Sequence, residues 1–487
     1  MLKLFDAQLL KSEAFIDGTW VPANSGARFA VKNPASGETL AEVADGDEAD
    51  ARVALEAAAR ALPGWRKKTA KERAAQMRKW FELIMANQED LAQLMTAEQG
   101  KPLAEARGEV AYGASFIEWF AEEGKRVYGD VIPTNQPGRR IIVLKEPVGV
   151  VAAVTPWNFP NAMITRKCAP ALAAGCTFVV KPAEDTPLSA LALAELARRA
   201  GIPGGVFNVV PSNQPAKVGA EFTQSRLVRK FSFTGSTEIG KLLMRQCAST
   251  VKKVSLELGG NAPFIVFDDA DLDAAVEGAI LSKYRNMGQT CVCANRFLVQ
   301  ERIYDAFAEK LAVRVRALKV GDGRADGVTQ GPLINLAGVE KVERLLEDAL
   351  GKGAKIVTGG KRHPLGGTYF EPTVVRDATP AMAAAREEIF GPVALLYPFA
   401  HEADAIRLAN DTQFGLAAYF YARDLGRVMR VAEALEYGIL GINEGIISTE
   451  VAPFGGFKES GLGREGSKYG IEDYLEIKYL ALGGLGA

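Results

Sequence analysis

Between residues 149 and 266 the chain alternates short apolar runs with longer segments whose apolar residues recur every three or four positions. Runs such as GVVAAVTPW and TFVVKPAE are typical of buried strands, and SALALAELARRAG is typical of a helix. Two further runs, VFNVV and VRKFSFTGS, are also followed by helical patterns. This alternation predicts an α/β fold in which helices cover both faces of a parallel sheet.

Helical and strand patterns also occur on both sides of this region. Residues 47–62 and 69–99 are predicted helices, and Thr69 to Glu72 form a possible capping box at the start of the second. Apolar residues at helical spacing in this second helix are predicted core: Met77, Trp80, Phe81, Ile84 and Leu91. A second alternating region runs from about residue 262 to residue 450. A chain of 487 residues is too long for one core, so two or three domains are expected.

Two segments favour strands outside these regions. Residues 130–148 carry a Pro-Gly turn between extended stretches, and the C-terminal segment EDYLEIKYLALGGL alternates as a strand does. The C-terminal strand could pair with residues 130–148 or with another subunit.

Composition and charge exclude several classes of partner. The chain is 48% hydrophobic and 24% charged, with a net charge of -1, which gives no reason to expect nucleic acid or a membrane surface as partner. The charge-free run 147–165 contains three prolines and would make a poor membrane helix. The N-terminus is a poor signal peptide, and five scattered cysteines indicate a reducing compartment. A cytoplasmic, soluble protein is therefore expected.

The scarcity of histidine restricts the chemistry. His363 and His401 are the only two histidines, and neither has a ligand-like neighbour at helical spacing. A zinc site or a Ser-His or Cys-His couple is therefore not expected, and carboxylates must carry any acid–base chemistry. We predict no metal site.

Two strand ends have residues that suit a nucleotide. FTGSTEIG, residues 233–240, lacks the GxGxxG and P-loop patterns, but it opens a helix whose N-terminus favours an anion. Lys181 and Glu184 of VVKPAE could hold ribose hydroxyls, and the Glu184 carboxylate would repel a 2′-phosphate, which favours NAD over NADP. The alternatives are a simple helix cap and a solvated ion pair.

Two further motifs carry candidate reactive groups. Glu257 of LELGG lies between two leucines, and partial burial would raise its pKa toward that of a general base. Cys291 and Cys293 of GQTCVC follow a turn; they could be a metal clip, a disulfide, a nucleophile or packing residues. A metal needs two more soft ligands, and a nucleophile needs a nearby base or a positive dipole.

The motifs are more specific together than singly. WNFP, KPAE, FTGSTEIG, LELGG, GQTC and EEIFGP occur in this order along the chain. This set resembles the aldehyde dehydrogenase superfamily over nearly the whole sequence. WNFPNAMITRK, KYRNMGQTCVCANRF and EVAPFGGFKESGLGREGSKYGIEDYLEIKY are most similar to its succinate- and glutarate-semialdehyde dehydrogenases.

The resemblance implies roles for particular residues. Cys291 would be the nucleophile, Glu257 the general base and Asn158 the oxyanion-hole side chain. A substrate carboxylate would be held by Arg166, Arg285 and Ser448, although Thr449 follows Ser448 and the last assignment could shift by one. Both arginines could instead form structural ion pairs, above all Arg166, which lies in a Thr-Arg-Lys run. The implied cofactor contacts are Trp157, Lys181, Glu184, Phe233, Gly235, Ser236, Gly240, Leu258, Glu388 and Phe390.

The resemblance also implies the domain organisation and the partners. A nucleotide-binding domain would span 1–129 and 149–258, a catalytic domain 259–455, and a β extension 130–148 and 466–487 that joins subunits in a homodimer or homotetramer. The cofactor would be NAD or NADP and the substrate a semialdehyde carboxylate. Cys293 could form a reversible disulfide with Cys291, or only pack. The rival functions are oxidation of a neutral or amino aldehyde, thiol esterase activity, and a non-catalytic relative.

Overall fold

The computed structural model describes residues 3–485, so the outermost positions of the predicted first domain and of the extension, 1–2 and 486–487, lie outside the described residues. An eight-stranded sheet forms the larger lobe, with strand order β2-β1-β9-β8-β7-β10-β11-β21. Its five central strands are parallel, as the sequence pattern predicts. The strands are β1 (Ala14–Ile16), β2 (Thr19–Val21), β7 (Val150–Val154), β8 (Thr177–Lys181), β9 (Phe207–Val209), β10 (Val228–Thr234), β11 (Lys253–Glu257) and β21 (Gly461–Leu462).

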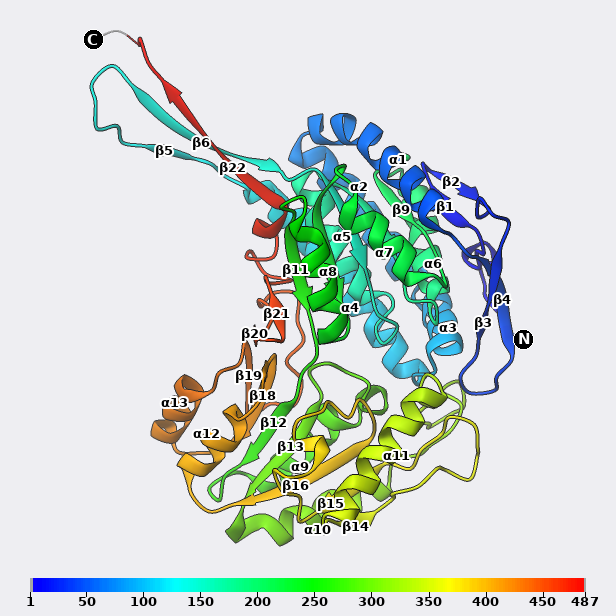
Figure 1. Cartoon of the computed structure of the whole chain (residues 1–487), viewed down its shortest axis with the longest axis vertical. Helices are drawn as coiled ribbons and strands as arrows, with labels where there is room; N and C mark the ends of the chain where they lie inside the picture. The colour runs from blue at the N-terminus through cyan, green and yellow to red at the C-terminus, as the bar shows by residue number, and fades with distance from the viewer. Residues whose placement is uncertain (1–2, 486–487) are drawn as a thin grey trace.

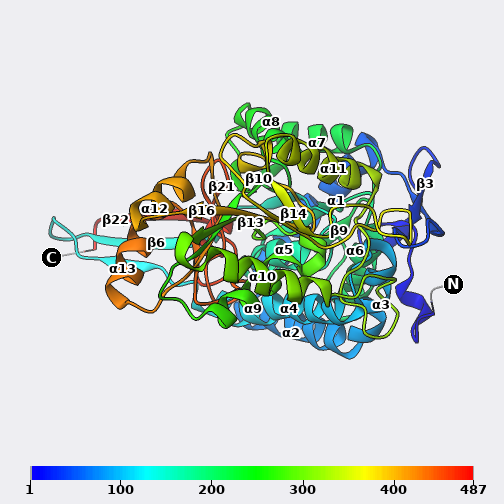
Figure 2. The same ribbon diagram turned by 90° about the horizontal axis from the view of Figure 1, so that it is seen from below.

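Eight helices belong to this lobe (Figures 1 and 2): α1 (Glu48–Lys67), α2 (Ala70–Ala86), α3 (Gln88–Gln99), α4 (Leu103–Glu123), α5 (Ala162–Ala174), α6 (Pro187–Arg199), α7 (Pro215–Gln224) and α8 (Thr237–Ala248). The single helix predicted over 69–99 is wrong, because it is divided at Asn87. The Asn87 carboxamide donates to the Leu83 carbonyl at 2.7 Å, which satisfies an end group of α2 with a side chain. The predicted capping box at Thr69 and Glu72 is confirmed.

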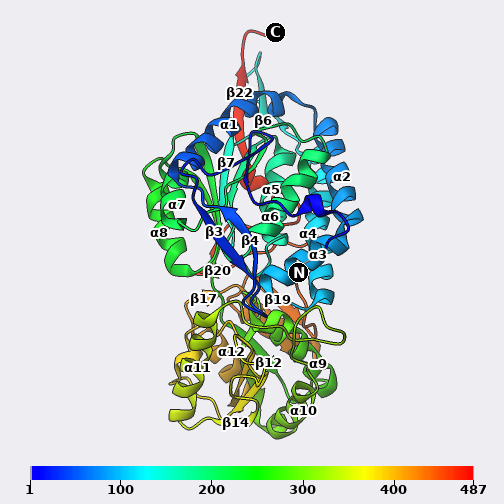
Figure 3. The same cartoon turned by 90° about the vertical axis from the view of Figure 1, so that its right-hand side faces the viewer.

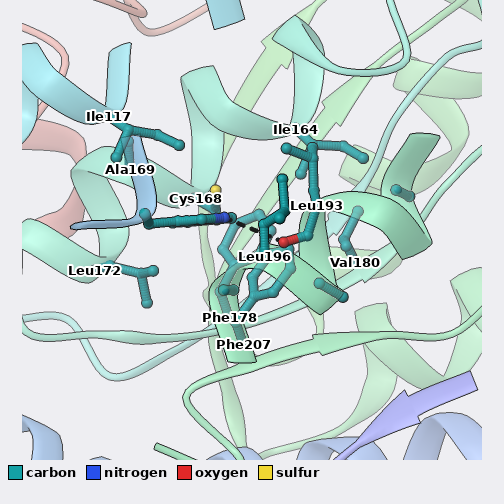
Figure 4. Close-up of a cluster of buried hydrophobic side chains, with 14 of the residues drawn as sticks. Ile117, Ile164, Cys168, Ala169, Leu172, Phe178, Val180, Leu193, Leu196 and Phe207 are labelled. Carbon is teal, nitrogen blue, oxygen red and sulfur yellow. Dashed lines mark hydrogen bonds between the residues drawn. The ribbon is translucent and has the colours of Figure 1, made fainter. Parts of the chain in front are cut away.

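Buried apolar side chains pack on both faces of this sheet, in one cluster with residues of α1, α7 and α8 and in a larger cluster with residues of α2 to α6. Figure 4 shows part of it, where Ile164, Leu172, Phe178, Leu193 and Phe207 meet, all fully buried. The predicted core stripe of α2 and α3 lies in this cluster: Met77, Trp80, Ile84 and Leu91 are buried, and Phe81 packs against them half-buried. The Trp80 indole donates to the Leu193 carbonyl at 3.1 Å, so its one polar atom is satisfied inside the core.

A seven-stranded sheet forms the second lobe, with order β14-β15-β16-β13-β12-β18-β19. Only β14 is antiparallel to its neighbour. The strands are β12 (Ala262–Val266), β13 (Ala294–Gln300), β14 (Lys355–Thr358), β15 (Thr373–Arg376), β16 (Val393–Phe399), β18 (Ala417–Tyr421) and β19 (Ile439–Ile442). The helices are α9 (Leu272–Lys283), α10 (Tyr304–Arg316), α11 (Leu336–Gly351), α12 (Glu402–Asn410) and α13 (Leu425–Ala434).

A three-stranded antiparallel sheet projects from the larger lobe (Figure 1). It consists of β5 (Asp130–Ile132), β6 (Arg140–Pro147) and β22 (Leu475–Leu482). The register runs from Leu475 opposite Pro147 to Leu482 opposite Arg140, so the C-terminal strand pairs with the 130–148 segment of its own chain. This is the first of the two pairings that the sequence left open.

The two main sheets meet where the chain passes from β11 to β12, and Figure 3 shows the lobes stacked with this junction between them. The hairpin of β3 (Arg28–Lys32) and β4 (Thr39–Ala44), near the N-terminus of the chain, extends from the larger lobe toward the junction (Figure 3). Residues 456–465, which no predicted domain included, add β20 (Phe457–Lys458), paired with β17 (Phe414–Gly415), and β21, paired with β11. The division into nucleotide-binding, catalytic and oligomerisation parts remains our proposal.

Within residues 3–485, no helix is both long and apolar enough to cross a membrane.

Candidate active site

A cavity of about 370 Å³ lies at the junction of the two lobes. The cavity wall brings together nine of the predicted site residues: Cys291, Glu257, Asn158, Trp157, Gly235, Ser236, Leu258, Glu388 and Phe390. They come from the ends of β7, β10 and β11 and from two loops of the second lobe. This follows the rule that parallel sheets bind ligands beyond the carboxyl ends of their strands.

The turn before Cys291 has a strained backbone. Asn286, Met287 and Gly288 have φ values of 51°, 57° and 74°, which are left-handed conformations that side-chain-bearing residues rarely adopt. A Cβ at Gly288 would clash with the Gly391 carbonyl oxygen. Such strain persists only where neighbours hold it, and here the Glu105 carboxylate accepts from the Asn286 amide at 2.8 Å.

Side chains fix the same loop from both lobes. Asn158 Nδ2 donates to the Gln289 carbonyl at 3.0 Å, and the Ile334 amide donates to Gln289 Oε1 at 2.9 Å. The Tyr419 hydroxyl donates to the Val292 carbonyl at 2.7 Å. The Cys291 loop and the Asn158 turn are therefore held as one unit, a rigidity that preorganised catalysis requires.

The Cys291 thiol is partly exposed in the cavity and is a thiol, not a thiolate, at neutral pH. Desolvation by the surrounding protein raises its pKa to about 12, Arg166 lowers it, and the carboxylates of Glu388 and Glu257 raise it. Activation of Cys291 therefore needs a base that removes the proton.

Glu257 is positioned to be that base. It ends β11 with 3% exposure, lines the cavity, and its Oε2 has no hydrogen-bond partner. Burial raises the pKa of this carboxyl well above its ordinary value, and the negative charge of Glu465 raises it further. A carboxyl group with a raised pKa near a thiol is suited to proton transfer near neutral pH.

Arg166 lies within a buried ion cluster next to the site. Its Nη2 is 2.7 Å from Glu465 Oε2, and Lys167 also pairs with Glu465. The guanidinium lies 4.0 Å from the centre of the Phe454 ring, and its Nε has no hydrogen-bond partner. Burial lowers the pKa of Arg166, but Glu465, Tyr112, Glu257 and Cys291 together outweigh it, so the pKa is raised. The structural ion pair that the sequence left open for Arg166 is thus present.

Arg285 is a cation of a different kind. It is partly exposed, lies 5.4 Å from the centre of the Phe159 ring, and forms no ion pair with a carboxylate anywhere in residues 3–485. Ser448 is half-buried and, like both arginines, is not part of the cavity wall.

The other side of the cavity suits a dinucleotide. Ser236 caps the N-terminus of α8, with its hydroxyl accepting from the Ile239 amide at 3.4 Å. Trp157 and Phe390 pack edge to face at 5.5 Å, and burial raises the pKa of Glu388 to about 7. Thr234 Oγ1 and Asn158 Oδ1 are buried in the wall without partners, so the lining retains polar atoms that a bound group can satisfy.

Four predicted cofactor residues lie outside this cavity. Phe233 is 5% exposed, lies in the apolar core with its ring against Gly235, and is not part of the cavity wall. Gly240 supports the wall by packing against Leu258. Lys181 Nζ donates to Glu184 at 2.6 Å, and Glu184 borders a neighbouring cavity of about 640 Å³. The position of Phe233 away from the cavity wall follows from its place within β10, because successive residues of a strand face opposite sides of the sheet.

A family model described as "Aldehyde dehydrogenase family" matches residues 20–480. The chain belongs to the aldehyde dehydrogenase family.

Similar proteins within the family are closely related to this chain. The glutarate-semialdehyde dehydrogenase of Pseudomonas aeruginosa is 63% identical over 99% of this chain and 100% of its own length. The succinate-semialdehyde dehydrogenase (NADP+) GabD of Escherichia coli K12 is 64% identical over 99% and 100%. A solved succinate-semialdehyde dehydrogenase from Burkholderia pseudomallei has a TM-score of 0.98 at 64% identity, covering 99% and 100%.

Several lining residues of this aldehyde dehydrogenase were not predicted from the sequence. Pro156, Thr234, Gln289, Asn335 and Lys341 line the cavity. Gln289 stands inside the quoted GQTC motif and could have been included. Asn335 caps α11, accepting from the Gly338 amide at 3.0 Å, and Lys341 follows on the same helix, but neither belongs to a motif that indicates the site.

Cys293 is buried at 7% exposure. Its one S–H has two carbonyl acceptors within reach, Lys283 at 3.4 Å and Ala294 at 3.5 Å, and all five cysteines are free. A disulfide with Cys291 requires the Cys293 side chain to leave these two acceptors. The reversible disulfide and the packing role therefore both remain predictions.

The rate at which iodoacetamide inactivates the cofactor-free enzyme should rise about tenfold per pH unit from pH 7 to pH 10, since only the thiolate reacts. The pKa near 12 leaves the thiolate fraction far from saturation over this range. Activity loss and mass spectrometry of the Cys291 peptide measure the rate, with Cys291→Ser as the unlabelled control. A plateau below pH 9 would contradict the raised pKa.

Hydrogen peroxide should inactivate the wild-type enzyme reversibly. Peroxide oxidises the Cys291 thiol to a sulfenic acid with release of water, and condensation with the Cys293 thiol gives a disulfide and a second water. Dithiothreitol should then restore activity in the wild type and much less in Cys293→Ala, with Cys247→Ala as the matched control. If Cys293→Ala loses and regains activity like the wild type, Cys293 only packs.

Proposed function

We propose that this aldehyde dehydrogenase oxidises succinate semialdehyde to succinate with NAD+ or NADP+, through a thiohemiacetal and a thioester on Cys291. Glutarate semialdehyde is the alternative substrate, since one methylene gives only about 1–3 kcal/mol of discrimination. One observation carries the proposal: Cys291, Glu257 and Asn158 line a single cavity that also borders the N-terminus of α8.

The first chemical step uses residues of both lobes. Glu257 takes the proton of Cys291, and the thiolate attacks the aldehyde carbon. The Asn158 carboxamide has two N–H donors, of which one is held by the Gln289 carbonyl, so the second is free for the developing oxyanion. Together with the backbone N–H of Cys291 it forms an oxyanion hole, in which one donor contributes about 3–4 kcal/mol to the transition state.

Release of the acid needs water and the same base. A bound nicotinamide cofactor would supply the hydride acceptor for oxidation at the aldehyde carbon. Glu257 first releases the proton of Cys291 to solvent. It then takes a proton from water as the water oxygen attacks the thioester carbon, and it gives this proton to the Cys291 sulfur as the carboxylic acid leaves. Trp157, Ser236, Glu388 and Phe390 are the residues that would hold the cofactor, because they line the same cavity.

We assign the binding of the substrate carboxylate to Arg285. A semialdehyde ends in a carboxylate, and guanidinium binds carboxylate in a bidentate manner. Arg285 is available for this, because it stacks on Phe159 and pairs with no carboxylate among the described side chains. Arg166 contributes positive charge nearby while it holds Glu465. The relatives named for succinate and glutarate semialdehyde support the same class of substrate.

We also propose a homodimer or homotetramer joined through the β5-β6-β22 extension. Val131, Ile477 and Tyr479 are 73%, 70% and 61% exposed on it, and apolar side chains in such numbers are suited to an interface. A cytoplasmic location is proposed from the five free cysteines.

Initial rates at 340 nm with succinate semialdehyde, glutarate semialdehyde and butanal test the substrate. The wild type should prefer the two carboxylated aldehydes. Arg285→Ala should raise KM for the semialdehydes about 10- to 100-fold, the value of a charged hydrogen bond of about 1.5–3 kcal/mol, and change KM for butanal little. Equal effects on charged and neutral aldehydes, or faster turnover of butanal by the wild type, would reject the substrate assignment.

Glu184 should determine cofactor preference. We expect the wild type to favour NAD, because the Glu184 carboxylate would repel a 2′-phosphate. Glu184→Ala should raise the ratio of kcat/KM for NADP to that for NAD about tenfold. Glu221→Ala on α7 is the matched loss of a carboxylate, since Glu221 also pairs with a basic side chain, Arg52. An unchanged ratio in Glu184→Ala would show that this carboxylate does not contact the adenosine ribose.

A further inference from the structure

Lys101 is a fully enclosed lysine that none of the catalytic steps uses. It lies in the connection between α3 and α4 and is 2% exposed. Lysine is almost never buried unless it is paired, because removing an ammonium group from water is costly. Gly100 makes the sharp turn that directs Lys101 inward, with φ of 95° and no room for a Cβ beside Pro332 and Pro34.

The contacts of the Lys101 ammonium group lead directly to the oxyanion turn. Nζ donates to the Asn158 carbonyl at 2.7 Å and to Glu109 Oε2, and it lies 4.0 Å from the centre of the Phe159 ring. One side chain thus contacts both Asn158 and Phe159 of the WNFP turn. An ammonium over an aromatic ring and beside a carboxylate is held strongly in a dry environment.

The same peptide group receives a second donor from the nucleophile loop. Asn286 Nδ2 donates to the Asn158 carbonyl at 3.1 Å, and Gln99 Nε2 donates to Asn286 Oδ1 at 3.0 Å. Gln99 and Lys101 therefore act on the two loops from one short segment of chain. The Asn158 carbonyl is the point where the two sets of contacts meet.

Glu109 completes the arrangement on the other side of the turn. Its Oε1 accepts from the amides of Asn161 at 2.9 Å and Ala162 at 3.3 Å, which are donors at the start of α5. The Lys101–Glu109 pair consequently holds the WNFP turn at both ends, at the Asn158 carbonyl and at the first turn of α5.

We propose that Lys101 is a positioning residue for the oxyanion hole: by holding the backbone carbonyl of Asn158, it fixes the direction in which the Asn158 carboxamide meets the substrate oxygen. The inference rests on the proposed thiol-dependent aldehyde oxidation. Errors of about 1 Å in such a donor cost about 100-fold in rate, so a buried clamp on its backbone has a direct catalytic consequence.

The test compares Glu109→Gln with Lys101→Met/Glu109→Gln. Both variants lack the Glu109 charge, so the carboxylate that forms the ion pair with Lys101 is not left behind when Lys101 is removed. The carboxamide oxygen introduced by Glu109→Gln can still accept from Asn161 and Ala162. They differ in the donor to Asn158. The double variant should have a kcat at least tenfold below that of Glu109→Gln, with KM for the cofactor changed less than twofold. A kcat within twofold of Glu109→Gln overturns the proposal.

A double-mutant cycle with Asn158→Ala separates positioning from general support of the fold. When each of the two variants also carries Asn158→Ala, their kcat values should differ less than twofold, because the carboxamide that Lys101 directs is gone. An undiminished difference in that background overturns the proposal. Active sites are counted by titration of Cys291, so misfolded protein does not enter kcat.

Folding and substrate choice are controlled separately. If Lys101→Met/Glu109→Gln does not fold, Lys101→Gln/Glu109→Gln replaces it, because the shorter glutamine side chain fills part of the space with polar atoms. The same criteria apply to its kcat. If neither double variant folds, Lys101 serves stability and the proposal is overturned. The assay uses whichever aldehyde the wild type oxidises. An enzyme that prefers butanal rejects the semialdehyde assignment and leaves this test intact.

Discussion

The buried ion cluster of Glu465 with Arg166 and Lys167 is the interaction on which the site depends. It ties the C-terminal segment to α5, the helix that follows the Asn158 turn, and so keeps β21 paired with β11 beside Glu257. Burial and the charge of Glu465 raise the pKa of Glu257, and Arg166 lowers it, so this carboxyl group is tuned by charges that are themselves paired. Breaking a buried pair from one side leaves an unpaired charge, which makes this cluster costly to alter.

The strained turn at Asn286, Met287 and Gly288 shows how such support is used. Its left-handed backbone presents Cys291 to the cavity, and contacts from Glu105 and Asn158 hold it from the first lobe. The thiol itself stays protonated in these surroundings, so reactivity depends on the base across the cavity. Strain, desolvation and charge thus all act at the junction of the two lobes. Neither lobe alone has the full set of groups, because Cys291 belongs to one lobe and Glu257 and Asn158 to the other.

Motif residues at strand ends could be predicted because their positions follow from chain periodicity. Ser236 at the start of α8 and Glu257 at the end of β11 both face the cavity, as the order of strand and helix implies. The orientation of Phe233 could not be predicted in this way, because Phe233 lies within β10 and not beyond its end, and its side chain packs in the core. Arg166 was recognised as either substrate contact or ion pair, and its partner Glu465 lies near the other end of the chain. Lys101 and Glu109 belong to no catalytic motif, and their contacts with the Asn158 turn join segments distant in sequence.

The sequence by itself determined the α/β class, the alternation of strands and helices, and the family, because these follow from local periodicity and from the order of short motifs; the resemblance that these motifs carry also named the candidate nucleophile and base. Only the tertiary structure decided which arginine is left without a carboxylate partner. Arg285 and Arg166 are equally charged in sequence, yet one stacks on Phe159 without a carboxylate and the other is paired with Glu465. The physical reason is that desolvation and ion pairing depend on distances across the junction, which residues far apart in the chain set together.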